Sequence, residues 1–206
     1  MNAHPDDEAM YTRRVALRPL REDDYVTIFQ WRNRPSYRFN VMGYDDVVTF
    51  EEFTEQMHRF GLIRPFRYMV SSQISGHDIG FAYARDHSED GTSCFLNVYI
   101  EDGAAGRGYG VDVFGLMARF LLREAGVEQI FADVFSYNTM SLSTLRSSRL
   151  RERVLTEKTR EHGGTTYPMH RFEVTGADLD RIEEMLSGLD VRSGSGAAHV
   201  GSKPGA

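Results

Sequence analysis

One stretch decides the fold of this chain: residues 95–110, which read FLNVYIEDGAAGRGYG. Its first six residues have the aromatic and β-branched content of a strand, and residues 106–110 contain three glycines. A run with helical spacing follows, so the glycines lie between a strand and the start of a helix. Such a turn lets backbone amides converge at a helix N-terminus and form a cradle for a phosphate-like anion.

By itself the turn is equally typical of an ordinary connection between a strand and a helix. Two nucleotide-binding motifs are excluded. Val111 stands where a Rossmann turn requires its third glycine, and the Gly-Lys-Ser/Thr sequence of a P-loop does not follow.

The rest of the chain alternates between the period of a strand and the period of a helix. Period-two patterns predict strands at 15–19, 66–70, 79–83, 130–135, 153–159 and 167–174, the last two joined through Gly163 and Gly164. Helical spacing predicts helices at 21–31, after the capping box at 49–52, and at 108–124, 139–149 and 177–186. The order β-α-α-β-β-β-α-β-α-β-β predicts a mixed α/β fold with helices flanking a mixed sheet.

Composition limits the partners and the domain organisation. We expect one domain at residues 12–186, a flexible N-terminal arm at 1–11 and a flexible, Gly/Ser/Ala-rich tail at 187–206. A net charge of −6 argues against nucleic acid as a partner. Without a long apolar run or a signal peptide, we expect a cytoplasmic protein with no membrane contact. The single cysteine, Cys94, excludes a disulfide framework and a cysteine-rich zinc site, and no metal is expected.

Several motifs in the same order resemble the GNAT acetyltransferases, especially the branch that acetylates ribosomal-protein alanines and related amines. The similarity extends over roughly residues 12–174. Its motifs are Leu17-Arg18-Pro19-Leu20-Arg21 with Asp23, Trp31-Arg32-Asn33, Ile79-Gly80-Phe81, Gly106-Arg107-Gly108-Tyr109-Gly110, and Tyr137-Asn138 with Ser141.

The resemblance implies a GNAT fold: a twisted central sheet in which the strand ending at Ile100 splays from its neighbour. The pantetheine arm of acetyl-CoA, or of another acyl-CoA, would fill the gap, and the glycine turn would hold the pyrophosphate. The implied cofactor-binding residues are Tyr99, Ile100, Ala105, Gly106, Arg107, Gly108, Tyr109, Gly110 and Asn138. Asn138 also suits a helix N-cap, and the two roles are compatible.

The chain departs from the family pattern at several positions. Ala105 replaces the Arg or Gln that usually begins the turn, and Arg107 is a candidate to compensate. Phe95 stands where many relatives carry a catalytic glutamate, and Asn97 stands where they have glycine. Leu145 stands where they have a tyrosine that acts as the general acid. The usual Leu-Gly-Phe before the last hairpin reads Ser-Arg-Leu at 148–150.

Acyl transfer to an amine requires a base for the amine proton, a stabilised oxyanion and a protonated thiol leaving group. Glu101 and Asp102 follow the splayed strand and are the first candidates for the base, although both suit an ordinary soluble turn. Asp133 and His170 are held in reserve. Ser141 matches a family serine near the thiolate and is the second catalytic candidate, although its position also suits a plain helix hydroxyl.

The leading functional prediction is an enzyme that acetylates the primary amine of a small molecule. The first alternative is a ribosomal-protein N-terminal alanine acetyltransferase, and the second is a non-catalytic acyl-CoA-binding module. We expect a monomer or homodimer, with the acceptor between the first helices, the loop at 35–44 and the last hairpin. Candidate acceptor residues there are Arg34, Tyr37, Arg38 and Tyr44.

Overall fold

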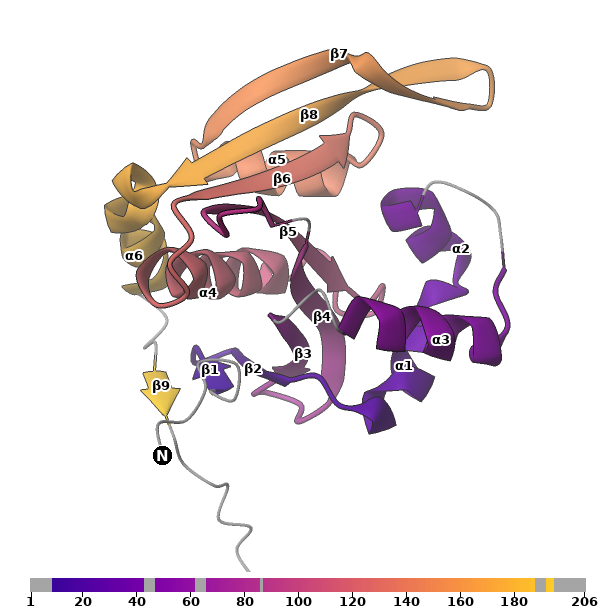
Figure 1. Ribbon diagram of the computed structural model, residues 1–206, viewed down its shortest axis with the longest axis horizontal. Coiled ribbons are helices and arrows are strands. Elements are labelled where there is room, and N and C mark those ends of the chain that lie inside the picture. Colours follow the sequence, from indigo (N-terminus) through magenta and orange to yellow (C-terminus); the bar gives the residue numbers. More distant parts are fainter. Residues whose placement is uncertain (1–8, 43–46, 62–65, 86, 188–191, 195–206) are drawn as a thin grey trace, which may run out of the picture.

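The computed structural model describes residues 9–42, 47–61, 66–85, 87–187 and 192–194 (Figure 1). The strands are β1 (Ala9–Tyr11), β2 (Val15–Pro19), β3 (Arg67–Ser72), β4 (Asp78–Arg85), β5 (Ser93–Ile100), β6 (Gln129–Phe135), β7 (Arg151–His162), β8 (Thr165–Thr175) and β9 (Arg192–Gly194). The helices are η2 (Glu22–Asp24), α1 (Tyr25–Arg32), α2 (Pro35–Tyr37), η3 (Arg38–Met42), α3 (Phe50–Gly61), α4 (Tyr109–Arg123), α5 (Thr139–Ser147), η4 (Gly176–Asp178) and α6 (Leu179–Ser187). The predicted order of the major elements is confirmed.

The strands form one mixed sheet in the order β7-β8-β6-β5-β4-β3-β2-β1-β9. Every neighbouring pair is antiparallel except β5 and β6. Two strands lie in segments expected to be flexible: β1 in the arm at 1–11 and β9 in the tail at 187–206. Each pairs with the other, and β1 also pairs with β2. The sequence predicts neither strand, because three residues are too few to show a period and β9 pairs with a strand at the other end of the chain.

The sheet splits between its two parallel strands, as the family resemblance implies. Pairing of β5 with β6 ends at Phe95 and Phe131, although β5 runs on to Ile100 and β6 to Phe135. Beyond that point β5 stays paired with β4, and β6 stays paired with β8. The two halves of the sheet therefore diverge, and the split opens toward the carboxyl ends of both strands.

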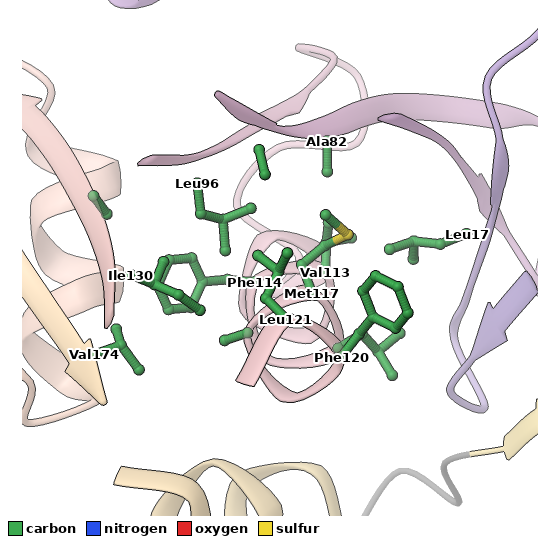
Figure 2. Close-up of a cluster of buried hydrophobic side chains, with 14 of the residues drawn as sticks. Leu17, Ala82, Leu96, Val113, Phe114, Met117, Phe120, Leu121, Ile130 and Val174 are labelled. Atoms are coloured by element: carbon green, nitrogen blue, oxygen red, sulfur yellow. The ribbon is translucent and has the colours of Figure 1, made fainter. Parts of the chain in front are cut away.

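Helix α4 packs against one face of the sheet and carries most of the main core. Figure 2 shows Val113, Met117 and Leu121 of this helix among Leu17, Ala82, Leu96 and Ile130 from the strands. A second cluster lies under α1 and α3, where Ile28, Trp31 and Phe53 cover Met69 and Phe81. In Figure 1, α4 and α6 flank the strands on one side and α1 and α3 on the other. Alternation along β3 and β4 supplies both clusters, since neighbouring side chains point to opposite faces.

Local sequence signals account for the ends of several helices. The capping box before α3 is confirmed: Thr49 N donates to Glu52 Oε2 (2.8 Å), and Glu52 N donates to Thr49 Oγ1 (3.2 Å). Helix α4 begins one residue later than predicted, because Gly108 is its N-cap with φ +81°. Arg149, where the family has glycine, keeps a left-handed backbone with φ +52° before β7. No helix in the described ranges is both long and apolar enough to cross a bilayer.

Candidate active site

A cavity of about 850 Å³ occupies the split between β5 and β6 and extends to the start of α4. Its volume is in the range of small-molecule and cofactor sites. The walls come from both faces of the sheet: Phe81 and Tyr83 belong to the side of α1, and Gly110 and Phe114 belong to α4. Most of the residues predicted to bind the cofactor line it, namely Tyr99, Ile100, Ala105, Gly106, Gly108, Tyr109, Gly110 and Asn138.

The glycine turn has the backbone that its sequence suggests. Gly106 and Gly108 both have positive φ, +75° and +81°, which an L side chain rarely adopts. A Cβ on Gly106 would have no atom within 4 Å, so the surface beside it is open. Arg107 is exposed and does not line the cavity. The turn therefore presents backbone, and the side chain at 107 is directed elsewhere.

The backbone of β5 divides between the two edges of the strand. Glu101 N donates to Ile79 O on β4 (2.8 Å), and hydrogen-bonding groups alternate between the edges of a strand. The backbone groups of Tyr99 therefore also face β4, whereas those of Ile100 and Val98 face the split. Of the two residues expected to offer backbone groups to the pantetheine arm, Ile100 is directed toward the split and Tyr99 is not.

The two base candidates after β5 separate in the structure. Glu101 does not line the cavity, and its Oε2 accepts a hydrogen bond from Arg34 Nη1 (3.0 Å). Asp102 lines the cavity, and its Oδ2 accepts from Ser36 Oγ (2.6 Å). Arg34 is the N-cap of α2 and Ser36 lies within that helix, and no local pattern near β5 reveals either partner. Asp102 is the carboxylate that a ligand in the cavity can reach.

The two reserve candidates for the base are each paired with another side chain. Asp133 lines the cavity, but it forms a bidentate ion pair with Arg171 on β8, with both N–O distances 2.7 Å. His170 is buried outside the cavity lining, and its Nδ1 lies 2.7 Å from Glu152 Oε1. These contacts give both residues a structural explanation.

Two side chains at the start of α5 reach the cavity. Asn138 is the N-cap of this helix, and its Oδ1 accepts from Ser141 N (3.2 Å). Ser141 is half-buried and also lines the cavity. The capping bond uses only the side-chain oxygen of Asn138 and not its amide nitrogen. The capping and ligand-binding roles therefore remain compatible.

Sequence reasoning missed two buried polar atoms in the cavity wall. Tyr99 Oη and Asn97 Nδ2 have no hydrogen-bond partner among the described residues, although both atoms are buried. Burial, with a smaller contribution from Asp102, raises the pKa of Tyr99 to about 12. The hydroxyl thus keeps its proton at neutral pH. Buried polar groups normally have partners, so these two atoms are exceptions in the cavity wall.

A contact between η3 and the tip of the last hairpin lies beside the cavity wall at Tyr137. The ring of Phe39 lies 4.5 Å from that of Tyr137 and 4.6 Å from that of His162. Tyr137 Oη donates to Phe39 O (3.0 Å) and accepts a hydrogen bond from Arg160 on β7. Of the predicted acceptor residues, Tyr37 lines the cavity, while Arg34 and Arg38 are absent from its lining. Tyr44 lies outside the described residues.

Comparison with known families and structures agrees with this geometry. The family model of the acetyltransferase (GNAT) domain matches residues 14–151, which is more than half of the chain. No curated protein sequence matches the chain significantly. Within the described residues, no group of three or more His, Cys, Asp or Glu side chains is arranged to hold a metal ion.

Solved structures share the fold at low sequence identity. Spermidine N-acetyltransferase from Vibrio cholerae, in complex with CoA and spermine, has a TM-score of 0.71 at 15% identity, covering 80% of this chain and 97% of that one. A GNAT-family acetyltransferase from Bacillus anthracis has a TM-score of 0.67 at 12% identity, covering 81% and 98%. RimL, a ribosomal L7/L12 α-N-protein acetyltransferase in complex with coenzyme A, has a TM-score of 0.65 at 12% identity, covering 79% and 94%.

Proposed function

Because the chain belongs to the GNAT acetyltransferase family, we propose that it transfers the acetyl group of acetyl-CoA to the primary amine of a small molecule. Family membership makes it an acetyl-CoA-dependent acyltransferase. The acceptor class and the role of each residue are the proposal. The observation that supports the acceptor class is the contact of Phe39 with His162 at the hairpin tip and with Tyr137 in the cavity wall, since an acceptor larger than a compact amine would have to displace it.

The cavity has backbone and side-chain groups that suit the pantetheine arm and the pyrophosphate of acetyl-CoA. The split leaves one edge of β5 unpaired beyond Phe95, so the pantetheine amides can bond to Val98 and Ile100 as an added strand would. The turn at Gly106 and Gly108 offers backbone amides next to the start of α4, where the helix dipole favours the negatively charged pyrophosphate. Asn138 lies beside the same cavity and is suited to a polar group of the arm.

The acceptor would enter from the side of α1 and α2. There the wall combines aromatic rings with the carboxylate of Asp102, an arrangement that suits an ammonium group before it loses its proton. Asp102 can take that proton directly or through a water molecule. This assigns to Asp102 the role that the sequence divided between Asp102 and Glu101, because Arg34 holds Glu101 outside the cavity wall.

One hydroxyl group is available for the leaving thiolate, that of Ser141, which lines the cavity at the start of α5. Ser141→Ala should lower kcat with little change in the affinity for coenzyme A, because a donor that acts only on the developing thiolate stabilises the transition state.

The experiment that tests the function measures release of the free thiol of coenzyme A from acetyl-CoA. The acceptors are a panel of amino sugars, amino acids and polyamines, with Ala- and Ser-starting ribosomal peptides beside them. Turnover with a compact amine and none with peptides is expected. Turnover only with the peptides would favour the ribosomal alternative, and the contact between Phe39 and the hairpin tip would then have to open.

Binding and catalysis are separated by a second measurement. Coenzyme A should raise the melting temperature, since a ligand that binds only the native state stabilises it by mass action. A clear thermal shift without turnover on any acceptor would favour the non-catalytic acyl-CoA-binding alternative. The absence of any shift at millimolar coenzyme A would refute the proposed cofactor site. Monomer or homodimer remains the expected state, although one neighbour, a spermidine N-acetyltransferase from Vibrio cholerae, is dodecameric.

A further inference from the structure

Arg14 lies in the connection between β1 and β2, distant in the chain from the glycine turn but in contact with it. Its guanidinium forms a forked ion pair with Asp112, with Nε–Oδ2 2.8 Å and Nη2–Oδ1 2.6 Å. Asp112 lies in the first turn of α4 and is only 1% exposed. Nothing in the local sequence marks this pair.

The other edge of the same guanidinium bonds to the turn itself. Nη1 of Arg14 donates to Arg107 O (3.1 Å), and Nη2 donates to Gly108 O (3.2 Å). In a trans peptide the carbonyl and the following N–H point in opposite directions. Holding these two carbonyls on the side of Arg14 therefore directs the N–H groups of Gly108 and Tyr109 away from it. Both of these residues line the cavity.

The ion pair also removes a charge from the anion site. A carboxylate in the first turn of a helix interacts favourably with the helix N-terminus, and there it would repel a phosphate bound to the same amides. The bidentate pairing with Arg14 neutralises Asp112 at this position. A residue outside the turn thus contributes to the orientation of the amides, together with the bond from Val111 N to Gly108 O (3.1 Å), and supplies the charge balance.

We propose that Arg14 is a positioning residue for the pyrophosphate of the acyl-CoA substrate, acting through Asp112 and the carbonyls of Arg107 and Gly108. The inference rests on the proposed function, because it needs coenzyme A in this cavity. It goes beyond that function by assigning the shape and charge of the turn to a side chain that does not line the cavity.

Calorimetric titration with coenzyme A tests the proposal on Arg14→Ala, Asp112→Asn and the double variant. Arg14→Ala should raise Kd about tenfold to hundredfold, the range of one to two charge-assisted hydrogen bonds. Asp112→Asn should leave Kd unchanged or lower it. The double variant should bind more tightly than Arg14→Ala, because removing the carboxylate restores the charge balance although the hydrogen bonds from Arg14 to the two carbonyls stay absent.

Arg18→Ala is the matched control. Arg18 lies on β2 and makes a similar forked ion pair with the buried Asp24 of η2, and neither residue lines the cavity. This variant should lose stability but keep the wild-type Kd. If Arg14→Ala does not fold, Arg14→Lys replaces it, since a lysine keeps the charge but cannot hold both carbonyls and the carboxylate. Its Kd should rise several-fold.

Three results would overturn the inference. Wild-type affinity in folded Arg14→Ala, or in Arg14→Lys where that variant is used, would show that the turn needs no such support. Equal affinities for Arg14→Ala and the double variant would refute the charge balance. An equal loss in Arg18→Ala would show that any forked ion pair of β2 and its flank has the same effect. Failure of the wild-type protein to bind coenzyme A would instead refute the proposed function, so the two failures are distinguishable.

Discussion

Enlarging Gly80 should weaken binding of coenzyme A in a protein that still folds. Gly80 lies on β4 opposite Ile100, the last residue of β5. A Cβ at this position would lie 2.1 Å from Tyr99 O and 3.1 Å from Ile100 Cα. Close carbon–oxygen contacts between strands are about 3.3 Å, so Gly80→Ala requires a displacement of about 1 Å at the end of β5.

The displacement acts on the backbone that faces the split. If the groups of Val98 and Ile100 bond to the pantetheine arm, a shift of about 1 Å weakens or breaks two hydrogen bonds worth about 1 kcal/mol each. The expected loss of about 2 kcal/mol corresponds to a rise of about thirtyfold in the Kd for coenzyme A. Overpacking should also lower the free energy of unfolding by about 1–3 kcal/mol.

Titration calorimetry with coenzyme A and urea unfolding measure the two effects on the same preparations. Gly176→Ala is the matched control, because a Cβ there has no atom within 4 Å and the backbone φ is not positive. The control should keep both the wild-type Kd and the wild-type stability, or gain slightly in stability. Folded Gly80→Ala with wild-type affinity would refute the assignment of the end of β5 to the pantetheine arm.

Three further predictions concern stability and reactivity. In urea unfolding, the free energy of unfolding of Arg149→Gly should exceed that of Arg149→Ala by about 0.5–1 kcal/mol, because only glycine relieves the left-handed backbone. A lower value for Arg149→Gly would contradict this. Burial alone would raise the pKa of Asp24, but hydrogen bonds from Arg18 and the backbone of Arg21 outweigh it and lower that pKa below its ordinary value. The resulting stabilisation is present above about pH 4 and is lost as the pH falls through the folded-state pKa. Asp24→Asn should therefore reduce the fall in stability at acidic pH in a plot of unfolding free energy against pH. An unchanged fall would exclude Asp24 as its source. Burial raises the pKa of Cys94 to about 12, so Ellman's reagent at pH 8 should modify it only in the unfolded protein; rapid modification of the native protein would show that the thiol is accessible.

The periodicity and the glycine turn were sufficient to predict most of the fold. Strand and helix patterns arise from neighbouring residues, so β2 to β8 and the main helices could be located from the sequence before any contact between them was known. The split between β5 and β6 followed from the family resemblance and is confirmed by pairing that stops at Phe95. Boundaries shifted by a few residues where a special backbone decides them, as at Gly108.

The electrostatic connections of the site could not be predicted in the same way. Glu101 and Asp102 are adjacent in the sequence, yet Arg34 and Ser36 bind them differently and leave only Asp102 in the cavity wall. These contacts join segments more than sixty residues apart, and a charged residue carries no local sign of its partner. The roles predicted for Ser141, Asn138 and the turn residues stay predictions until coenzyme A binding is measured.

The split passes through the sheet, and this has a kinetic consequence. Because the cavity has walls on both faces, at Phe81 and at Phe114, the acyl donor and the acceptor need not share an entrance. Both can then be bound at once, so double-reciprocal plots of initial rate should intersect, whereas a covalent acyl-enzyme would give parallel lines. A bisubstrate compound that joins the thiol of coenzyme A to an acceptor amine would reach through the sheet. It would combine the binding free energies of both ligands in a single association event.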